Sequence, residues 1–181
     1  NVLKGKVFTA LSTYHNQYPL RKGPPAQEVR SRLGVSQTVY QRVLARLGEE
    51  QFVVEEDRSV RLPEHEISLT PDMEQQAGKF LQALEQDPYS PPSNQPLDPE
   101  LLGVLIEQGK VVRVTDSVIF ATSTYQDMVN RIVEHMKIQG SITVAEARTM
   151  FDTSRKYVLP LLEYMDRQQI TRRSGDERVL R

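Results

Sequence analysis

Two patterns follow one another toward the C-terminus: apolar positions recur at helical spacing, then in short runs broken by a polar turn. The spacing i, i+3, i+4, i+7 indicates one buried helix face, made by Val158, Leu161, Leu162 and Met165. We expect this helix to open at Thr153–Tyr157. Residues 170–173 and 178–181 then predict two strands of a hairpin.

Another helix is predicted just upstream, because Thr143 and Glu146 have the spacing of a capping box. It should end near Phe151, and Ser141–Ile142 should pair with the later hairpin. Helix, short turn, helix and basic hairpin together predict a winged helix-turn-helix, whose second helix usually enters a nucleic-acid groove. A helix before it is indicated by a buried stripe, Met128, Ile132, Val133 and Met136.

The same order of elements is predicted twice more. Near the N-terminus, three helical stretches precede expected strands at 51–54 and 59–62. In the middle, helices begin at Thr70–Pro71 and Asp98–Pro99, but the prolines of residues 87–96 leave the usual second helix reduced or missing. The predicted fold class is therefore mainly α, an α+β winged-helix architecture. Three tandem winged helix-turn-helix units, each a small helical bundle with a short β-hairpin, are expected at residues 1–66, 67–122 and 123–181.

Composition excludes several classes of function. The 181 residues include no cysteine, which rules out disulfides and thiolate metal sites. The three histidines lie far apart, so neither a metal nor a cofactor is expected. No apolar run nears the roughly 18 residues of a membrane span and no signal-peptide pattern is present, so a cytoplasmic protein is expected. There is no phosphate-binding GxxxxGK[ST] loop and no catalytic set, so we predict no catalytic residue and no enzyme.

Charge is unevenly distributed along the chain. Residues 67–122 carry 3 basic and 8 acidic side chains, whereas residues 1–66 and 123–181 each carry 10 basic and 8 acidic. Phosphate would be repelled by the middle unit, which suits a spacer or docking role, and the hairpin tip of the first unit is acidic as well. Within residues 153–181 alone, 7 basic side chains face 4 acidic ones. Nucleic-acid contact is therefore predicted at the C-terminal unit.

Candidate binding residues lie on two features of that unit. Arg155 and Lys156 begin the second helix, and Arg172 and Arg173 lie on the hairpin, which predicts one basic face. For Arg155 and Lys156, C-capping or ion pairs with neighbouring carboxylates are the alternative.

Ser154 is a further candidate, because it offers a hydroxyl donor. The Tyr157 ring either stacks on an unpaired base or packs in the core. Arg148 either reaches this face or pairs with Glu146 or Asp152.

Several stretches resemble the bacterial selenocysteine-specific translation elongation factor SelB. The densest similarity is in Thr153–Tyr157, Leu162–Arg167 and Thr171–Arg181, which look like the C-terminal end of that family. Tyr14–Arg21 and Glu28–Gly34 look like the start of its second winged-helix unit. The resemblance thus covers the whole chain.

This resemblance implies binding to the apical loop of a selenoprotein mRNA hairpin, the selenocysteine insertion element (SECIS). It places recognition of an unpaired base on Thr153, Ser154, Arg155, Lys156 and Tyr157. The family's full-length protein is a GTPase that brings selenocysteinyl-tRNA to the ribosome at UGA codons, so GTP and Mg²⁺ belong to domains outside this chain. Pro160 departs from the small helix former of the family, and an interior proline costs about 3 kcal/mol or kinks the helix.

Two other classes of protein fit the same pattern. A tandem winged-helix transcription regulator would be a symmetric dimer that reads duplex DNA, whereas a SelB-like region is expected to be a monomer. A protein-interaction scaffold is favoured by the acidic middle unit. Its binding need not weaken with salt, unlike binding through phosphate contacts.

Overall fold

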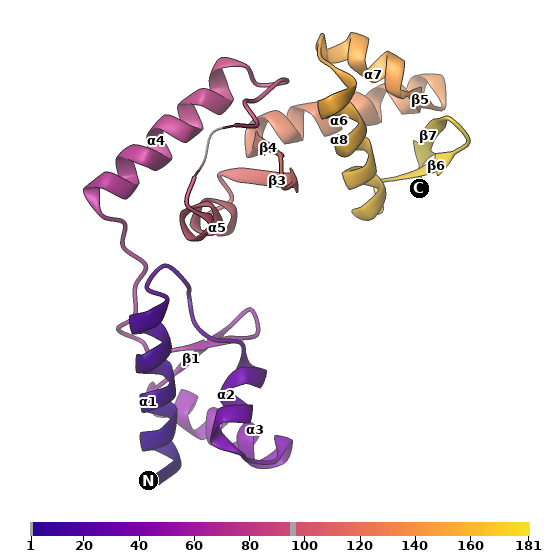
Figure 1. Ribbon diagram of the computed structural model, residues 1–181. Coiled ribbons are helices and arrows are strands. Elements are labelled where there is room, and N and C mark those ends of the chain that lie inside the picture. Colours follow the sequence, from indigo (N-terminus) through magenta and orange to yellow (C-terminus); the bar gives the residue numbers. More distant parts are fainter. Residues whose placement is uncertain (1, 95–96) are drawn as a thin grey trace. The chain divides into compact units, whose positions relative to one another are not determined.

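The computed structural model describes residues 2–94 and 97–181, which form two compact units (Figure 1). Unit 1 ends at Asp72, and unit 2 begins at Met73. No helix in the described ranges is long and apolar enough to cross a membrane.

Unit 1 is a winged helix of three helices and a hairpin. The helices are α1 (Val2–Gln17), α2 (Ala26–Leu33) and α3 (Gln37–Glu49), and the antiparallel strands are β1 (Val54–Glu56) and β2 (Ser59–Arg61). The core of this unit takes residues from α1, α2, α3 and β2, and also Val53 and Leu62, which lie next to the strands. Its members are Val7, Leu11, Val29, Leu33, Tyr40, Leu44, Leu47, Val53, Val60 and Leu62.

Local signals explain most of the boundaries in unit 1. Gly34 ends α2 in a left-handed conformation, with φ of 64°, and the Ser36 hydroxyl accepts the Val39 amide at the start of α3. The strand expected at 51–54 is wrong except at Val54, because β1 covers Val54–Glu56. Gln51 has a positive φ of 53°, and the Phe52 amide donates to the Leu47 carbonyl, so these residues finish the helix before β1 begins.

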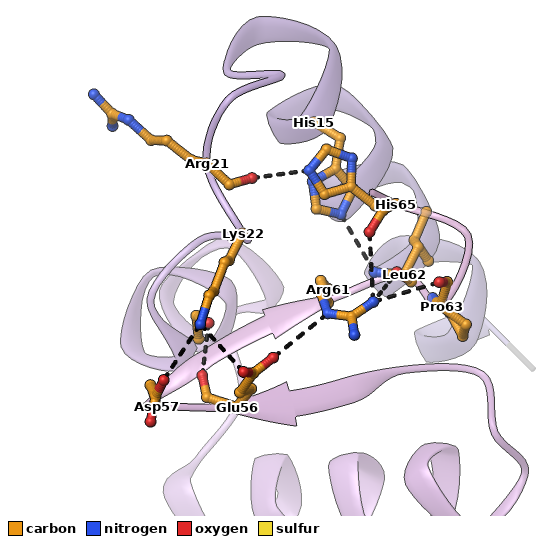
Figure 2. Close-up of polar contacts among 10 residues, drawn as sticks. His15, Arg21, Lys22, Glu56, Asp57, Arg61, Leu62, Pro63 and His65 are labelled. Carbon is orange, nitrogen blue, oxygen red and sulfur yellow. Dashed lines mark hydrogen bonds and ion pairs between the residues drawn. The ribbon is translucent and has the colours of Figure 1, made fainter. Parts of the chain in front are cut away.

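Two stacked histidines join α1 to the residues after β2. Figure 2 shows the imidazole rings of His15 and His65 one over the other, with centroids 3.7 Å apart. The Leu62 amide donates to Nε2 of His15, and His65 Nε2 lies 2.8 Å from the Arg21 carbonyl. The Arg61 guanidinium donates to three carbonyls, including that of His65. Burial first, and then the charges of His65 and Arg61, lower the pKa of His15 to about 4.

This lowered pKa predicts that unit 1 loses stability in mild acid. Unfolded His15 titrates near its ordinary pKa of 6.5, so below that pH protons favour the unfolded chain, and the loss is complete below about pH 4. We expect the free energy of unfolding to fall by about 1–3 kcal/mol from this group. Urea unfolding of the wild type and His15→Gln at pH 7 and pH 4.5 measures it. Equal pH dependence in the two proteins would contradict the prediction.

Unit 2 begins with a helical pair and a hairpin. Its elements are α4 (Pro71–Gln86), α5 (Pro99–Glu107), β3 (Val111–Thr115) and β4 (Val118–Ala121). The Asp98 carboxylate accepts the amides of Glu100 and Leu101, which fixes the start of α5 as its sequence indicates. Residues 87–94 contain no helix, as their prolines predict, and residues 95–96 of the same stretch lie outside the described residues.

The rest of unit 2 is a winged helix with a three-stranded sheet. It comprises α6 (Thr122–Gln139), β5 (Ile142–Thr143), α7 (Val144–Phe151), α8 (Arg155–Arg167), β6 (Thr171–Ser174) and β7 (Glu177–Leu180). The antiparallel strand order is β5-β7-β6, with Ile142 opposite Arg178. The predicted pairing with the hairpin is confirmed at Ile142, and Thr143 rather than Ser141 is the second residue of the strand.

One hydrophobic core crosses the boundary expected at residue 122. Val114, Val118 and Phe120 of the β3–β4 hairpin cluster with buried residues of α6, α7 and α8. The four apolar residues expected to line α8 are all fully buried in this cluster: Val158, Leu161, Leu162 and Met165. The chain is mainly α with small β wings, as predicted, whereas its division into three units remains a prediction.

Candidate nucleic-acid interface

Helix α7, which leads into the turn before α8, is capped at both of its ends. The Thr143 hydroxyl accepts the Glu146 amide, and the Glu146 carboxylate accepts the Thr143 amide at 2.7 Å, which completes the predicted capping box. The Thr143 amide and hydroxyl also lower the pKa of Glu146. Asp152 ends α7 in a left-handed conformation, with φ of 46°. Only three residues, 152–154, separate the end of α7 from the N-terminus of α8.

Arg155 and Arg173 line one groove of about 440 Å³, although they come from α8 and β6. Among the described residues, the Arg155 guanidinium makes neither a hydrogen bond nor an ion pair, and Nε of Arg173 donates only to the nearby Gly175 carbonyl. The rest of the lining comes from the N-terminus of α7, the outer side of α8 and the hairpin: Thr143, Val144, Ala145, Leu159, Glu163, Asp176 and Arg178. Two arginines that form no ion pair with any described residue thus share a groove with the carboxylates of Glu163 and Asp176.

The hairpin arginines differ in their surroundings. Arg172 and Arg173 are adjacent in β6, so their side chains leave opposite faces of the strand. Arg172 is exposed and does not line the groove. Arg178 is 3% exposed and donates to Asp166, which also accepts the Thr171 hydroxyl at 2.6 Å. That buried arginine therefore joins the hairpin to α8.

Thr153 and Lys156 contact residues of the proline-rich stretch instead of the groove. The Thr153 hydroxyl donates to the Tyr89 carbonyl at 2.8 Å and lies 2.7 Å from the Ser90 hydroxyl. Lys156 Nζ donates to the Ser93 hydroxyl at 2.6 Å. Nothing local in the sequence signals these contacts, because 63 or 64 residues separate the partners.

The other three candidates are dispersed around the turn. Ser154 is exposed, and its hydroxyl makes no capping bond. Tyr157 is half-buried against the core, with Lys156 Nζ 5.2 Å from its ring centroid. Arg148 is exposed on α7 and forms no ion pair with Glu146 or Asp152, both of which the structure describes. The helix α8 continues through Pro160, whose missing N–H removes the bond that the Lys156 carbonyl would accept.

The described residues contain no cluster of three or more His, Asp or Glu side chains that could hold an ion. What the surface offers is cationic and hydroxyl donors at the start of a helix, which suits phosphate and exposed bases.

Comparisons with known proteins identify the family. Two models described as elongation factor SelB, winged helix, match the chain, for the second winged helix at residues 8–62 and the third at residues 134–180. The selenocysteine-specific elongation factor of Desulfomicrobium baculatum is 26% identical over 196 residues, which cover 99% of this chain and 30% of that protein. The chain therefore spans about a third of the length of the curated relative it matches.

Two solved structures are also similar. The crystal structure of a bacterial selenocysteine-specific elongation factor, EF-Sec, matches with a TM-score of 0.53 and 17% identity, over 100% of this chain and 30% of the other. The mRNA-binding domain of SelB from E. coli in complex with SECIS RNA matches with a TM-score of 0.48 and 20% identity, over 62% and 99%. The first of these similarities supports the fold, and the second is too low to add to it. Two SelB winged-helix models match this chain, and a SelB relative aligns along 99% of it. The chain therefore belongs to the elongation factor SelB family, as a C-terminal winged-helix region.

Proposed function

We propose that this chain binds an mRNA hairpin, the selenocysteine insertion element, for a selenocysteine-specific elongation factor. The observation that carries the proposal is the groove shared by Arg155 and Arg173, within the segment that matches the third SelB winged helix. Arginine binds phosphate or guanine in a bidentate manner, and both guanidinium groups are open to solvent contact.

The chain acts as a binding module and not as an enzyme. In the whole protein it tethers a GTPase and selenocysteinyl-tRNA to the ribosome at UGA codons in the cytoplasm. GTP and Mg²⁺ are held by domains outside this chain, which itself needs no cofactor. Residues 1–122 set the distance between the hairpin and those domains. The chain binds its hairpin as a monomer, since one groove reads one loop.

The test is titration of a looped RNA hairpin and of duplex DNA of equal length, each at several salt concentrations. We expect tight binding of the hairpin alone, with log K falling as log salt rises, because phosphate contacts release counterions. Equal or tighter binding of duplex DNA would replace the proposal by a DNA-binding regulator. Binding of neither nucleic acid would leave a protein-interaction scaffold.

A further inference from the structure

The helix that carries Arg155 is attached at both ends to residues 89–121 of the same compact unit. At its C-terminal end, Arg167 donates to the Val114 carbonyl at 3.0 Å, and the β3–β4 hairpin packs into the core beside α8. At its N-terminal end, Thr153 and Lys156 contact the stretch 89–93. This stretch, together with Asp87 and Pro88, is called the strap below.

The strap is itself anchored to α6 and α7. The Tyr89 ring packs against Phe151, with centroids 5.1 Å apart. Its hydroxyl donates to Asp127 at 2.8 Å and accepts from Arg131 at 3.1 Å. Arg131 also donates to the Met150 carbonyl at 2.8 Å and lies over the Phe151 ring. A tyrosine that makes these contacts cannot move without disturbing the last turn of α7.

The Thr153 hydroxyl has no hydrogen left for an RNA ligand. Its single proton goes to the Tyr89 carbonyl, so the Ser90 hydroxyl, 2.7 Å away, must be the donor in the second bond. Both side chains are half-buried. The hydroxyl pair therefore joins strap to helix start, two residues before Arg155.

We propose that the strap orients the RNA-reading end of α8, and that Thr153, Ser90 and Tyr89 are positioning residues for hairpin binding rather than RNA contacts. This inference rests on the proposed function. It changes the part played by residues 67–122, because a segment that fixes the direction of Arg155 contributes to recognition without touching RNA. Asp87 is the one charged side chain of the strap, and residues 88–93 carry none.

The experiment is a double-mutant cycle in hairpin affinity, measured on the full chain with Thr153→Val and Ser90→Ala. Thr153→Val removes both hydrogen bonds of this link and Ser90→Ala removes one of them. We therefore expect about tenfold weaker binding from Thr153→Val, a smaller loss from Ser90→Ala, and little more from both changes together than from Thr153→Val alone. The salt slope should fall by about one, since a misdirected arginine loses its phosphate.

Thr153→Ser keeps the hydroxyl and should restore binding, and Tyr89→Phe should weaken it. Thr115→Val, which removes the 3.5 Å hydroxyl contact with Ser117 in the β3–β4 hairpin, is the matched control and should bind normally.

Several results would overturn the inference. Additive losses would mean that Thr153 and Ser90 act independently, as RNA contacts would. If Thr153→Val and Ser90→Ala bind the hairpin as tightly as the wild type does, the positioning role is wrong. The proposed function would still stand, because the wild type binds the hairpin. Failure of the wild type to bind the hairpin would overturn both. If Thr153→Val does not fold, Ser90→Ala and Tyr89→Phe test the inference instead. It then requires that these two variants bind the hairpin more weakly while their melting temperatures equal that of the wild type.

Discussion

Replacing Arg155 by alanine is expected to weaken hairpin binding by about 1–3 kcal/mol, roughly five- to over a hundredfold. The guanidinium makes no bond to the described part of the chain, so its removal leaves no buried group unpaired and acts on the ligand alone. Fluorescence anisotropy of a labelled hairpin at fixed salt measures the change.

Two further variants, at Arg173 in the groove and at Arg113 far from it in the sequence, test whether the effect is specific to the groove. Arg173→Ala should weaken binding in the same direction, and the salt slope should fall with each variant. Arg113→Ala removes an exposed arginine from β3, where it pairs with Asp116, and should leave affinity unchanged. Equal losses at Arg113 and Arg155 would indicate general charge attraction and would contradict a localised site.

Leu162→Ala is expected to cost unit 2 about 2–5 kcal/mol of unfolding free energy. The side chain is fully buried in the core shared by α6, α7, α8 and the β3–β4 hairpin, so its removal leaves a cavity. Thermal unfolding followed by circular dichroism should show the transition of unit 2 shifted downward and that of unit 1 unchanged.

Leu159→Ala is the matched control for this second prediction. It lies in the same helix but is only half-buried beside the groove, so a smaller loss is expected. A downward shift of both transitions in Leu162→Ala would mean that the two compact units unfold together.

Helix boundaries were accessible from sequence because their determinants lie within a few residues. Asp98 and the Thr143–Glu146 pair each cap the helix that the sequence predicts at that position. The start of β1 could not be predicted from the sequence, because Gln51 adopts a left-handed conformation that ordinary β propensity does not reveal.

The candidate site was accessible only in part. Its groove joins Arg155 to Arg173, which the charge pattern had grouped. The contacts of Thr153 and Lys156 with the strap were hidden because tertiary packing brings together residues more than sixty positions apart. Strand alternation, by contrast, is a sequence rule, and it separates Arg172 from Arg173.

The shared core has a consequence for synthesis, which proceeds from the N-terminus. The core of unit 1 is complete within Val7–Leu62, so this winged helix can form while later residues are still being added. The β3–β4 hairpin has no such independence, because Val114, Val118 and Phe120 pack against α6 and α8. The part of this cover that α8 supplies is missing until residue 165 has left the ribosome, so the second half of the chain folds late and as one piece.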